Sequence, residues 1–373
     1  MKRGWLLPLA FFTCVAVLLA EDIFTPDRVF SAQENRKLAQ RPAFSAKAVS
    51  DKSFMEEYEA YVTDQFPGRD GFIALKTQVQ RLLGKKDSNG VYFAPGNTLV
   101  EQHTPESVDI KKADRRAGRM VKQAADIQRM VPGRVSVMLV PSADAVQAGR
   151  LPDFAECFDQ KGWLDEVLAD ARRAGLTVVD AYGALYTHRE EEIYYGTDHH
   201  WTTLGAFYGY QAWAEACGLP LPVPEEYERT VVKEDFYGTL QAKVNLPVTP
   251  DRIERFDRAG EGEHEMRFPD MDGKEEASCY FYDKLETKDA YAFFLGGNYP
   301  VAQIRGDGDA DRSILLIRDS YANCFAPFLT RDYGTMWLVD RRYYRGDVTE
   351  LIAQYAPVDV LYLYNIFQFI EGF

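Results

Sequence analysis

From about residue 105 onward, the hydrophobic pattern alternates between short apolar runs and longer amphipathic stretches. Runs typical of buried strands fall at residues 135–140, 177–180, 292–295, 313–317, 335–339 and 359–364. Helical spacing closed by Gly or Pro-Gly falls at residues 107–130, 163–174 and 203–216, and further helices are expected between the last three strands. Apolar strands that alternate with helices predict an α/β fold with a mostly parallel sheet and helices on both faces.

The segments around this core are less regular. Residues 21–75 are expected to form an extended arm followed by a helix, since 53–66 has helical spacing and Pro67-Gly68 ends it. A strand and turn are expected at 90–97. Residues 221–292 are less regular and polar, and part of this segment is rich in Gly and Glu. We expect it to form a β-rich insertion beside the functional site. A catalytic domain over 76–373 would contain this insertion.

The first twenty residues have the composition of a targeting segment. Lys2 and Arg3 form a positive start, and an uncharged, mostly apolar run reaches Ala20 before Glu21 and Asp22. We expect a signal peptide or a short uncleaved anchor, hence an exported protein at the cell surface or in the periplasm. The run of about 16 residues is short for a full span, which needs roughly 20. Contact with a membrane is expected only through this segment.

Composition narrows the function classes. The chain of 373 residues has a net charge of −14, which argues against nucleic acid as a partner, because phosphate backbones select basic surfaces. The 22 Tyr and 23 Phe are mostly core residues, but aromatic side chains at a cleft rim also suit sugars. Four of the five Cys lie in the body, widely spaced, so they form no zinc pattern and at most two disulfides.

The most informative motif is Thr197-Asp198-His199-His200-Trp201-Thr202. An i, i+2 spacing on extended or turn backbone puts Asp198 and His200 on one side, where the carboxylate can orient the imidazole. We therefore interpret His200 as a general base and Asp198 as its orienting partner. His199 is expected to point the other way, as a bystander.

The third member of a triad is expected far downstream. Ser320 follows the strand at 313–317, and a helix is expected from about Tyr321, so the Ser N–H would lie at a helix start and suit an oxyanion. Asn365, at the end of another strand, and Asn298, in a Gly-Gly-Asn turn, are further oxyanion candidates. Trp201, which follows His200, and Arg318, which precedes Asp319-Ser320, are the other candidate oxyanion or substrate-binding residues.

Other interpretations of these motifs compete with catalysis. Asp198 and the Asp319-Ser320 pair are also common helix-capping residues, and Asn365 could be an ordinary turn residue. Asp198, His199 and His200 are all potential metal ligands, but adjacent His residues do not readily face one ion, and no His-Glu-x-x-His pattern accompanies them. We expect neither a metal nor a cofactor.

These motifs, with residues 31–38, 64–69 and Asp319-Ser320, resemble the DHHW family of bacterial surface proteins. That family is similar to periplasmic alginate O-acetyltransferases with an SGNH-hydrolase-like fold in permuted order. The resemblance spans about residues 30 to 370 and implies Asp198 and His200 as triad members and Ser320 as nucleophile. Two positions depart from the pattern: Arg318 stands where a Gly is expected, and the surroundings of Asn365 lack the Gly-x-Asn-Asp form.

The leading hypothesis is an exported serine acyltransferase that O-acetylates a cell-surface or secreted polysaccharide through an acyl-Ser320 intermediate. The resemblance implies a membrane-embedded acyltransferase as the acetyl source. A carbohydrate esterase would use the same triad, and a non-catalytic glycan-binding or assembly protein is the alternative from another class. A distance above roughly 6 Å between the Ser320 Oγ and the His200 ring would argue against catalysis.

Overall fold

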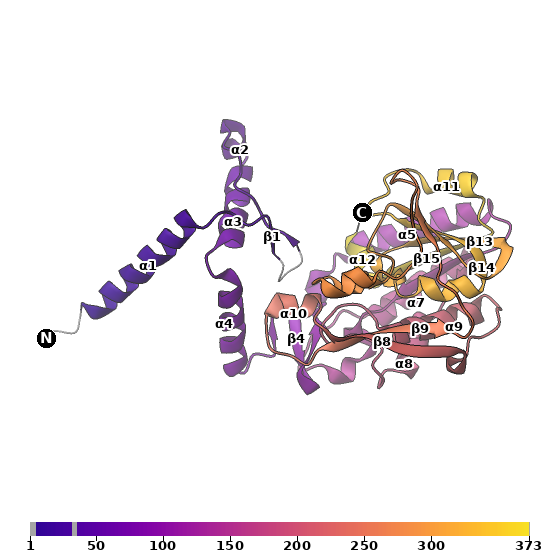
Figure 1. The fold of residues 1–373 in the computed structure, drawn as a ribbon, viewed down its shortest axis with the longest axis horizontal. Helices are drawn as coiled ribbons and strands as arrows, with labels where there is room; N and C mark the ends of the chain where they lie inside the picture. The colour runs from indigo at the N-terminus through magenta and orange to yellow at the C-terminus, as the bar shows by residue number, and fades with distance from the viewer. Residues whose placement is uncertain (1–4, 32–35, 373) are drawn as a thin grey trace. The chain divides into compact units, whose positions relative to one another are not determined.

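The structure is a computed structural model that describes residues 5–31 and 36–372. Lys2 and Arg3 of the targeting segment, and residues 32–35 of the arm, lie outside the described residues. The chain forms two compact units, one of residues 1–89 with 242–247 and the other of 90–241 with 248–373 (Figure 1). The boundary thus falls at residue 89, fourteen positions beyond the one expected from the sequence.

The first unit is built mainly of helices. Its elements are α1 (Leu6–Phe24), β1 (Phe30–Ser31), β2 (Arg36–Lys37), α2 (Ala46–Ser50), α3 (Ser53–Gln65), α4 (Arg69–Leu82) and β3 (Asp87–Ser88). By length and composition, α1 could cross a membrane, and none of it is buried in the structure. This agrees with a signal sequence or anchor. Helix α4 continues beyond Pro67-Gly68, where the sequence predicted no further helix.

The motifs at residues 31–38 and 64–69 are joined inside this unit through Arg36 and Asp64. The Arg36 guanidinium donates to both carboxylate oxygens of Asp64, at 2.8 and 2.5 Å, and the Ala39 amide donates to the same group at 2.8 Å. The hydrogen bonds to Arg36 outweigh burial and hold the pKa of Asp64 down at about 2. The arm is therefore fastened to the end of α3 by a charged pair with bidentate geometry.

The second unit contains one eight-stranded sheet in the order β11-β10-β12-β14-β13-β15-β6-β7. The five strands from β14 to β7 pair in parallel, and the three at the other edge pair antiparallel. This confirms the expected α/β class. The strands are β6 (Val135–Val140), β7 (Thr177–Val178), β10 (Met266–Phe268), β11 (Lys274–Glu276), β12 (Val301–Arg305), β13 (Asp309–Arg318), β14 (Tyr333–Asp340) and β15 (Asp359–Asn365).

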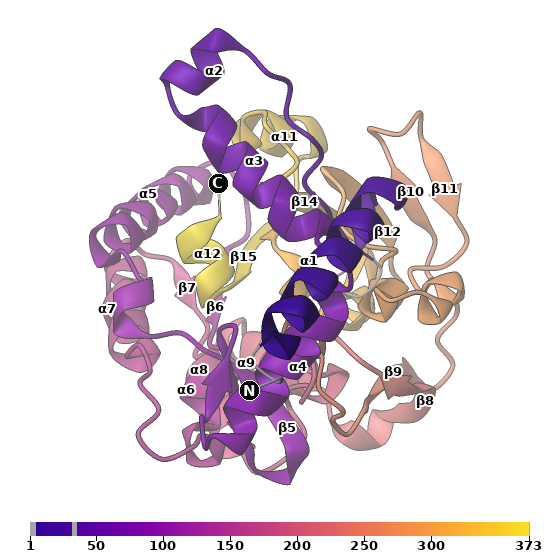
Figure 2. The same ribbon diagram turned by 90° about the vertical axis from the view of Figure 1, so that its left-hand side faces the viewer.

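Both faces of this sheet are covered, as the continuous apolar strands require. Leu315 and Ile317 of β13 pack into one buried cluster, while Ile314 and Leu316 pack into another on the opposite face. The helices are α5 (Ile110–Gln128), α6 (Ala143–Val146), α7 (Gln160–Arg173), α8 (Ala181–Thr187), α9 (Thr203–Ala216), α10 (Thr239–Val244), α11 (Val348–Tyr355) and α12 (Ile366–Glu371). Helices α5, α7, α11 and α12 contribute to the first cluster, and α8 and α9 to the second (Figure 1). Helices α5 and α7 lie side by side (Figure 2).

The remaining strands lie outside this sheet. They are the antiparallel pair β4 (Val91–Ala94) and β5 (Thr98–Glu101), and the long antiparallel ribbon of β8 (Tyr227–Phe236) and β9 (Asp251–Arg258). The expected β-rich insertion therefore supplies this ribbon and also strands β10 and β11 of the main sheet. The strand predicted at 292–295 is wrong: η6 (Ala290–Phe293) is a short 3-10 helix there. All five cysteines, each in the described part of the chain, are free.

In the second unit, His103 forms a buried imidazolium between two carboxylates. The His103 Nδ1 lies 3.3 Å from Asp144 and its Nε2 lies 3.6 Å from Glu101, while the ring stacks on Phe367 with centroids 3.5 Å apart. Burial opposes the charge on His103, but the hydrogen bonds to Asp144 and Glu101 raise its pKa to about 9. His103 is thus a buried counterion for Asp144, whose side chain is fully buried.

We expect this cluster to make stability depend on pH in the alkaline range. His103 binds its proton more tightly when folded, so its contribution, on the order of 3 kcal/mol, is full below the unfolded pKa of 6.5 and disappears as pH rises through about 9. Urea unfolding of the wild type and His103→Gln between pH 6 and 10 measures it. The gap between the two free energies of unfolding should shrink with rising pH, and a constant gap would contradict the assignment.

Candidate active site

The strand β13 ends at Arg318, and the Asp-Ser pair that follows makes a tight turn into η7 (Ser320–Ala322). The Asp319 carboxylate caps this turn, accepting from the Tyr321 amide at 2.9 Å and from the Asn365 amide at 2.8 Å. Asp319 is therefore the capping residue, and the Ser320 hydroxyl is left for another partner. The element after Ser320 is a single 3-10 turn, not the α-helix expected from the sequence.

That partner is His200. The Ser320 Oγ lies 2.9 Å from the His200 Nε2, and the His200 Nδ1 lies 2.6 Å from Asp198 Oδ1. A carboxylate only accepts, so Nδ1 carries the ring proton and Nε2 offers a lone pair to the Ser320 hydroxyl. The structure thus joins the three residues in a hydrogen-bonded row at well under 6 Å. All three side chains are buried.

Local backbone geometry holds the Asp198 loop in shape. Tyr194 and Trp201 form an isolated antiparallel bridge, and the Tyr195 amide donates to the His200 carbonyl at 3.2 Å, so residues 194–201 turn back on themselves. The Asp198 Oδ1 also accepts from the His200 amide at 3.0 Å. Because α9 begins at Thr203 and is capped by Thr202, the cap belongs to Thr202 and Asp198 is free to orient the imidazole.

The electrostatics favour a neutral base beside a charged carboxylate. Burial and the neighbouring His199 lower the pKa of His200 to about 4, so the imidazole is neutral near pH 7 and can accept a proton. Burial opposes the charge on Asp198, but the imidazoles of His199 and His200 hold the pKa of this carboxyl well below its ordinary value. Both pKa values are lowered, so near pH 7 the carboxylate is charged and the imidazole is neutral, as a general base and its orienting partner require.

The prediction that His199 points away is wrong. Its ring lies against the His200 ring with centroids 3.9 Å apart, and its Nδ1 lies 2.8 Å from Thr239 Oγ1. The turn at Asp198 is too tight for strict alternation of side chains. Asp198, His199 and His200 also offer three ligand atoms within 4.8 Å of one another, as a metal site would. The hydrogen bonds of Asp198 to His200 and Thr239 already use both carboxylate oxygens, which fits a triad better.

Tyr291 is a site residue that the sequence did not indicate. Its ring stacks on His200, with centroids 3.8 Å apart and an interplanar angle of 13°. Its hydroxyl donates to the Ser320 carbonyl at 3.1 Å. Tyr291 lies in η6, directly before the stretch 292–295 that the sequence pattern predicted as a strand, so nothing in its neighbours marked it.

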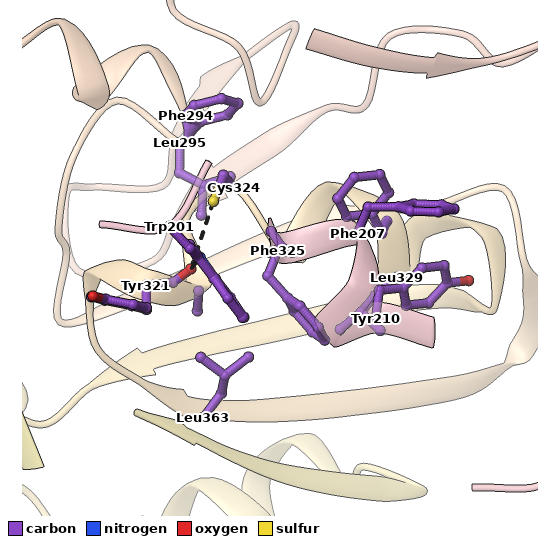
Figure 3. Packing of buried hydrophobic residues seen from close by; sticks show 14 of the residues in the cluster. Trp201, Phe207, Tyr210, Phe294, Leu295, Tyr321, Cys324, Phe325, Leu329 and Leu363 are labelled. Carbon is purple, nitrogen blue, oxygen red and sulfur yellow. Dashed lines mark hydrogen bonds between the residues drawn. The ribbon is translucent and has the colours of Figure 1, made fainter. Parts of the chain in front are cut away.

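Trp201 and Arg318 are both fully buried. The Trp201 Nε1 donates to the Tyr321 carbonyl at 2.9 Å, and the ring packs beside Tyr321 and Phe325 (Figure 3). Trp201 therefore joins the loop of His200 to the turn of Ser320. Arg318 lies 3.7 Å from Asp340, which is also fully buried. In the structure both side chains therefore contribute contacts that hold the site together.

The two candidate oxyanion donors differ in how their amides are used. The Asn365 Nδ2 donates to Ser142 Oγ at 2.9 Å and to the Val140 carbonyl at 3.3 Å, and its Oδ1 caps α12. The Asn365 side chain thus caps α12 and joins the end of β15 to the end of β6. The Asn298 Oδ1 accepts from Arg318 Nη1 at 2.7 Å. This fixes the amide of the half-buried Asn298 with its Nδ2 directed away from Arg318.

Comparisons with known proteins agree with this architecture. Residues 170–339, somewhat under half of the chain, match the family model described as DHHW protein. A DHHW family protein from Eubacterium siraeum has a TM-score of 0.63 at 22% identity, covering 77% of this chain and 94% of that one. PatB1 of Bacillus cereus has a TM-score of 0.60 at 16% identity, covering 75% and 96%. A second PatB1 structure carries a sulfonyl adduct.

A more distant match is the O-acetyltransferase domain of Pseudomonas putida AlgJ, with a TM-score of 0.47 and 15% identity over 76% of this chain and 93% of that one. The comparison with curated proteins finds no match. The resemblance to the DHHW family is confirmed, and the chain shares its mixed α/β fold with the DHHW family protein and with PatB1.

Proposed function

Taking the resemblance to the DHHW family as the premise, we propose that this chain is an exported serine acyltransferase that acetylates hydroxyl groups of a cell-surface or secreted polysaccharide. The observation that carries the proposal is the hydrogen-bonded row in which the Ser320 Oγ lies 2.9 Å from the His200 Nε2 and Asp198 stands behind it at 2.6 Å. The same row would support hydrolysis of an acetylated sugar if water replaced the acceptor hydroxyl.

The chemistry runs in two halves. In the first, the Ser320 Oγ attacks the carbonyl carbon of the acetyl donor while His200 Nε2 takes the hydroxyl proton; the bond to the leaving group breaks, and that group receives the proton. In the second, His200 takes the proton of a sugar hydroxyl as its oxygen attacks the acetyl-Ser320 ester. The bond between the acyl carbon and Ser320 Oγ breaks, and Oγ recovers its proton from the His200 imidazolium. Asp198 stabilises the imidazolium formed in each half.

A negative oxygen develops on the acetyl carbonyl in both halves and needs donors. Asn298 is the side chain best prepared for this, because Arg318 holds its carbonyl oxygen and leaves Nδ2 to donate. Arg318 also donates to Asn323 Oδ1 at 2.7 Å, which adds a second oriented amide next to Ser320. Arg318 in place of the expected Gly is thus compatible with catalysis, since it organises the turn from within.

Location and partners follow from the N-terminal helix and the family resemblance. Helix α1 is long and apolar enough to cross a membrane, and it would direct the chain to export or anchor it. An exported enzyme has no cytosolic acetyl donor within reach. A membrane-embedded acyltransferase is therefore the proposed source of acetyl groups, and a polysaccharide outside the membrane is the proposed acceptor.

Covalent labelling followed by a transfer assay tests the function. A sulfonyl fluoride or fluorophosphonate probe should modify Ser320, mapped by peptide mass, and labelling should vanish in His200→Ala. Acetylated donor ester and an oligosaccharide acceptor are then incubated with the protein. Acetyl-sugar supports transfer, and free acetate alone supports the esterase. Absence of both label and turnover would leave a binding or assembly protein on this scaffold.

A further inference from the structure

The Asp198 loop is held by the insertion as well as by its own turn. Two parts of the insertion contact residues 196–199, namely 236–241 at the end of β8 and Asp251 at the start of β9; we call them together the clamp. Phe236 and Asp251 are register partners in the β8–β9 ribbon, so both parts of the clamp leave from the same end of that ribbon. The ribbon therefore brings two separate sets of polar groups to one loop.

Asp251 accepts three hydrogen bonds from residues 196 and 197 of the Asp198 loop. Its carboxylate accepts from the Gly196 amide at 2.7 Å, the Thr197 amide at 2.7 Å and the Thr197 hydroxyl at 2.5 Å. Burial raises the pKa of Asp251 to about 6, so the group is ionised at pH 8 and accepts only. A carboxylate that receives two successive backbone amides fixes the peptide plane just before Asp198.

The other part of the clamp holds Asp198 itself. The Thr239 amide and hydroxyl donate to Asp198 Oδ2 at 2.8 and 3.0 Å, on the oxygen that does not face His200. The Leu240 amide donates to the Thr197 carbonyl at 3.0 Å. Gly238 approaches so closely that a Cβ there would lie 2.3 Å from the Asp198 side chain. The space left for the Asp198 carboxylate is therefore set by the insertion.

We propose that Asp251 is a positioning residue for the reaction at Ser320, which acts by fixing the Thr197 backbone so that Asp198 stays aligned with His200. The inference rests on the proposed function for its kinetic consequence but not for its geometry. On this assignment the insertion is part of the catalytic apparatus, and loss of the Asp251 contacts slows the chemical step without weakening substrate binding.

Asp251→Asn is the sharpest variant, because it keeps the shape but places an amide donor against the N–H and O–H donors of Gly196 and Thr197. At pH 8, with the full chain and p-nitrophenyl acetate, kcat is expected to fall by about 10²-fold with KM unchanged. Asp235→Asn, on the same ribbon with a side chain that is 75% exposed, is the matched control and should behave as the wild type. Wild-type kcat in Asp251→Asn would overturn the proposal.

A second measurement separates positioning from simple loss of stability. The low-field proton NMR resonance of His200 Nδ1–H reports the hydrogen bond to Asp198 and can be followed in a Ser320→Ala background. It should shift or disappear in Asp251→Asn, whereas a purely structural role would lower the free energy of unfolding and leave the resonance in place. If the wild type shows no turnover at all, the proposed function fails, while the resonance still decides the role of Asp251.

Gly238→Ala approaches the same carboxylate from the other part of the clamp. The added methyl group must displace Asp198, so kcat and the Nδ1–H resonance are expected to change as in Asp251→Asn. This variant also serves if Asp251→Asn does not fold. An unchanged resonance in Gly238→Ala would overturn the claim that the insertion sets the position of Asp198.

Discussion

Replacing Ser320 with Ala is expected to lower kcat for p-nitrophenyl acetate by about 10⁴-fold or more, with only background hydrolysis left. Under the proposed function the Ser320 Oγ forms the acyl bond, and no other hydroxyl is hydrogen-bonded to His200 among the described residues. Release of p-nitrophenol by purified proteins measures the effect. Ser107→Ala, an exposed serine outside the site, is the control and should retain wild-type kcat.

The double variant Ser320→Ala/His200→Ala makes the test stricter. Residues that act as one unit give strongly non-additive losses, so the double variant should be no slower than Ser320→Ala alone. If the losses of kcat in Ser320→Ala and His200→Ala multiplied in the double variant, His200 would act on a group other than Ser320. Equal rates in the wild type and Ser320→Ala would remove the triad from the mechanism.

Replacing Arg318 with Met is expected to lower the free energy of unfolding by about 3 kcal/mol, the lower end for removing one partner of a buried ion pair. Arg318 and Asp340 are both fully buried and 3.7 Å apart, and Arg318 Nη1 also satisfies the amide oxygens of Asn298 and Asn323. The loss is at the lower end because Arg342 keeps its contact with Asp340 at 2.6 Å. Denaturation in guanidinium chloride gives the difference.

Arg305→Met is the matched control for this change. Arg305 ends β12 in the same sheet, but its side chain is 57% exposed and its ion pair with Glu265 lies at the surface, so the expected effect is below about 1 kcal/mol. Equal stabilities of Arg318→Met and Arg305→Met would show that the buried arginine is not a structural centre of the turn before Ser320.

The regular parts of the fold could be predicted because local runs of apolar residues and helical spacing indicate which segments are buried strands and helices. The strand at 135–140 and the helix at 203–216 occur with the expected bounds, since each is a continuous apolar or helical stretch closed by clear punctuation. The stretch at 292–295 failed because apolar residues of a buried 3-10 turn have the same composition as a strand. The arm that ends in α4 extends further than expected, because the turn at Pro67-Gly68 separates two helices.

The candidate site divides along similar lines. Asp198, His200 and Ser320 could be proposed from spacing and strand ends, and the structure brings them together. Tyr291 and Asp251 could not, because their roles depend on contacts between distant segments that no local pattern encodes. Trp201 and Arg318 were named as oxyanion or substrate-binding candidates because each adjoins a motif, whereas in the structure both side chains are fully buried.

The six residues 242–247 leave the second unit and pack with the first. There the Asn245 amide donates to the Asp70 carbonyl at 3.0 Å and the Asn89 amide donates to the Lys243 carbonyl at 2.8 Å. A recombinant fragment that starts at residue 90 would lose both bonds and leave this excursion unsupported, next to the clamp residues in sequence. A fragment designed for crystallisation should therefore remove α1 alone, or replace 242–247 with a short designed loop.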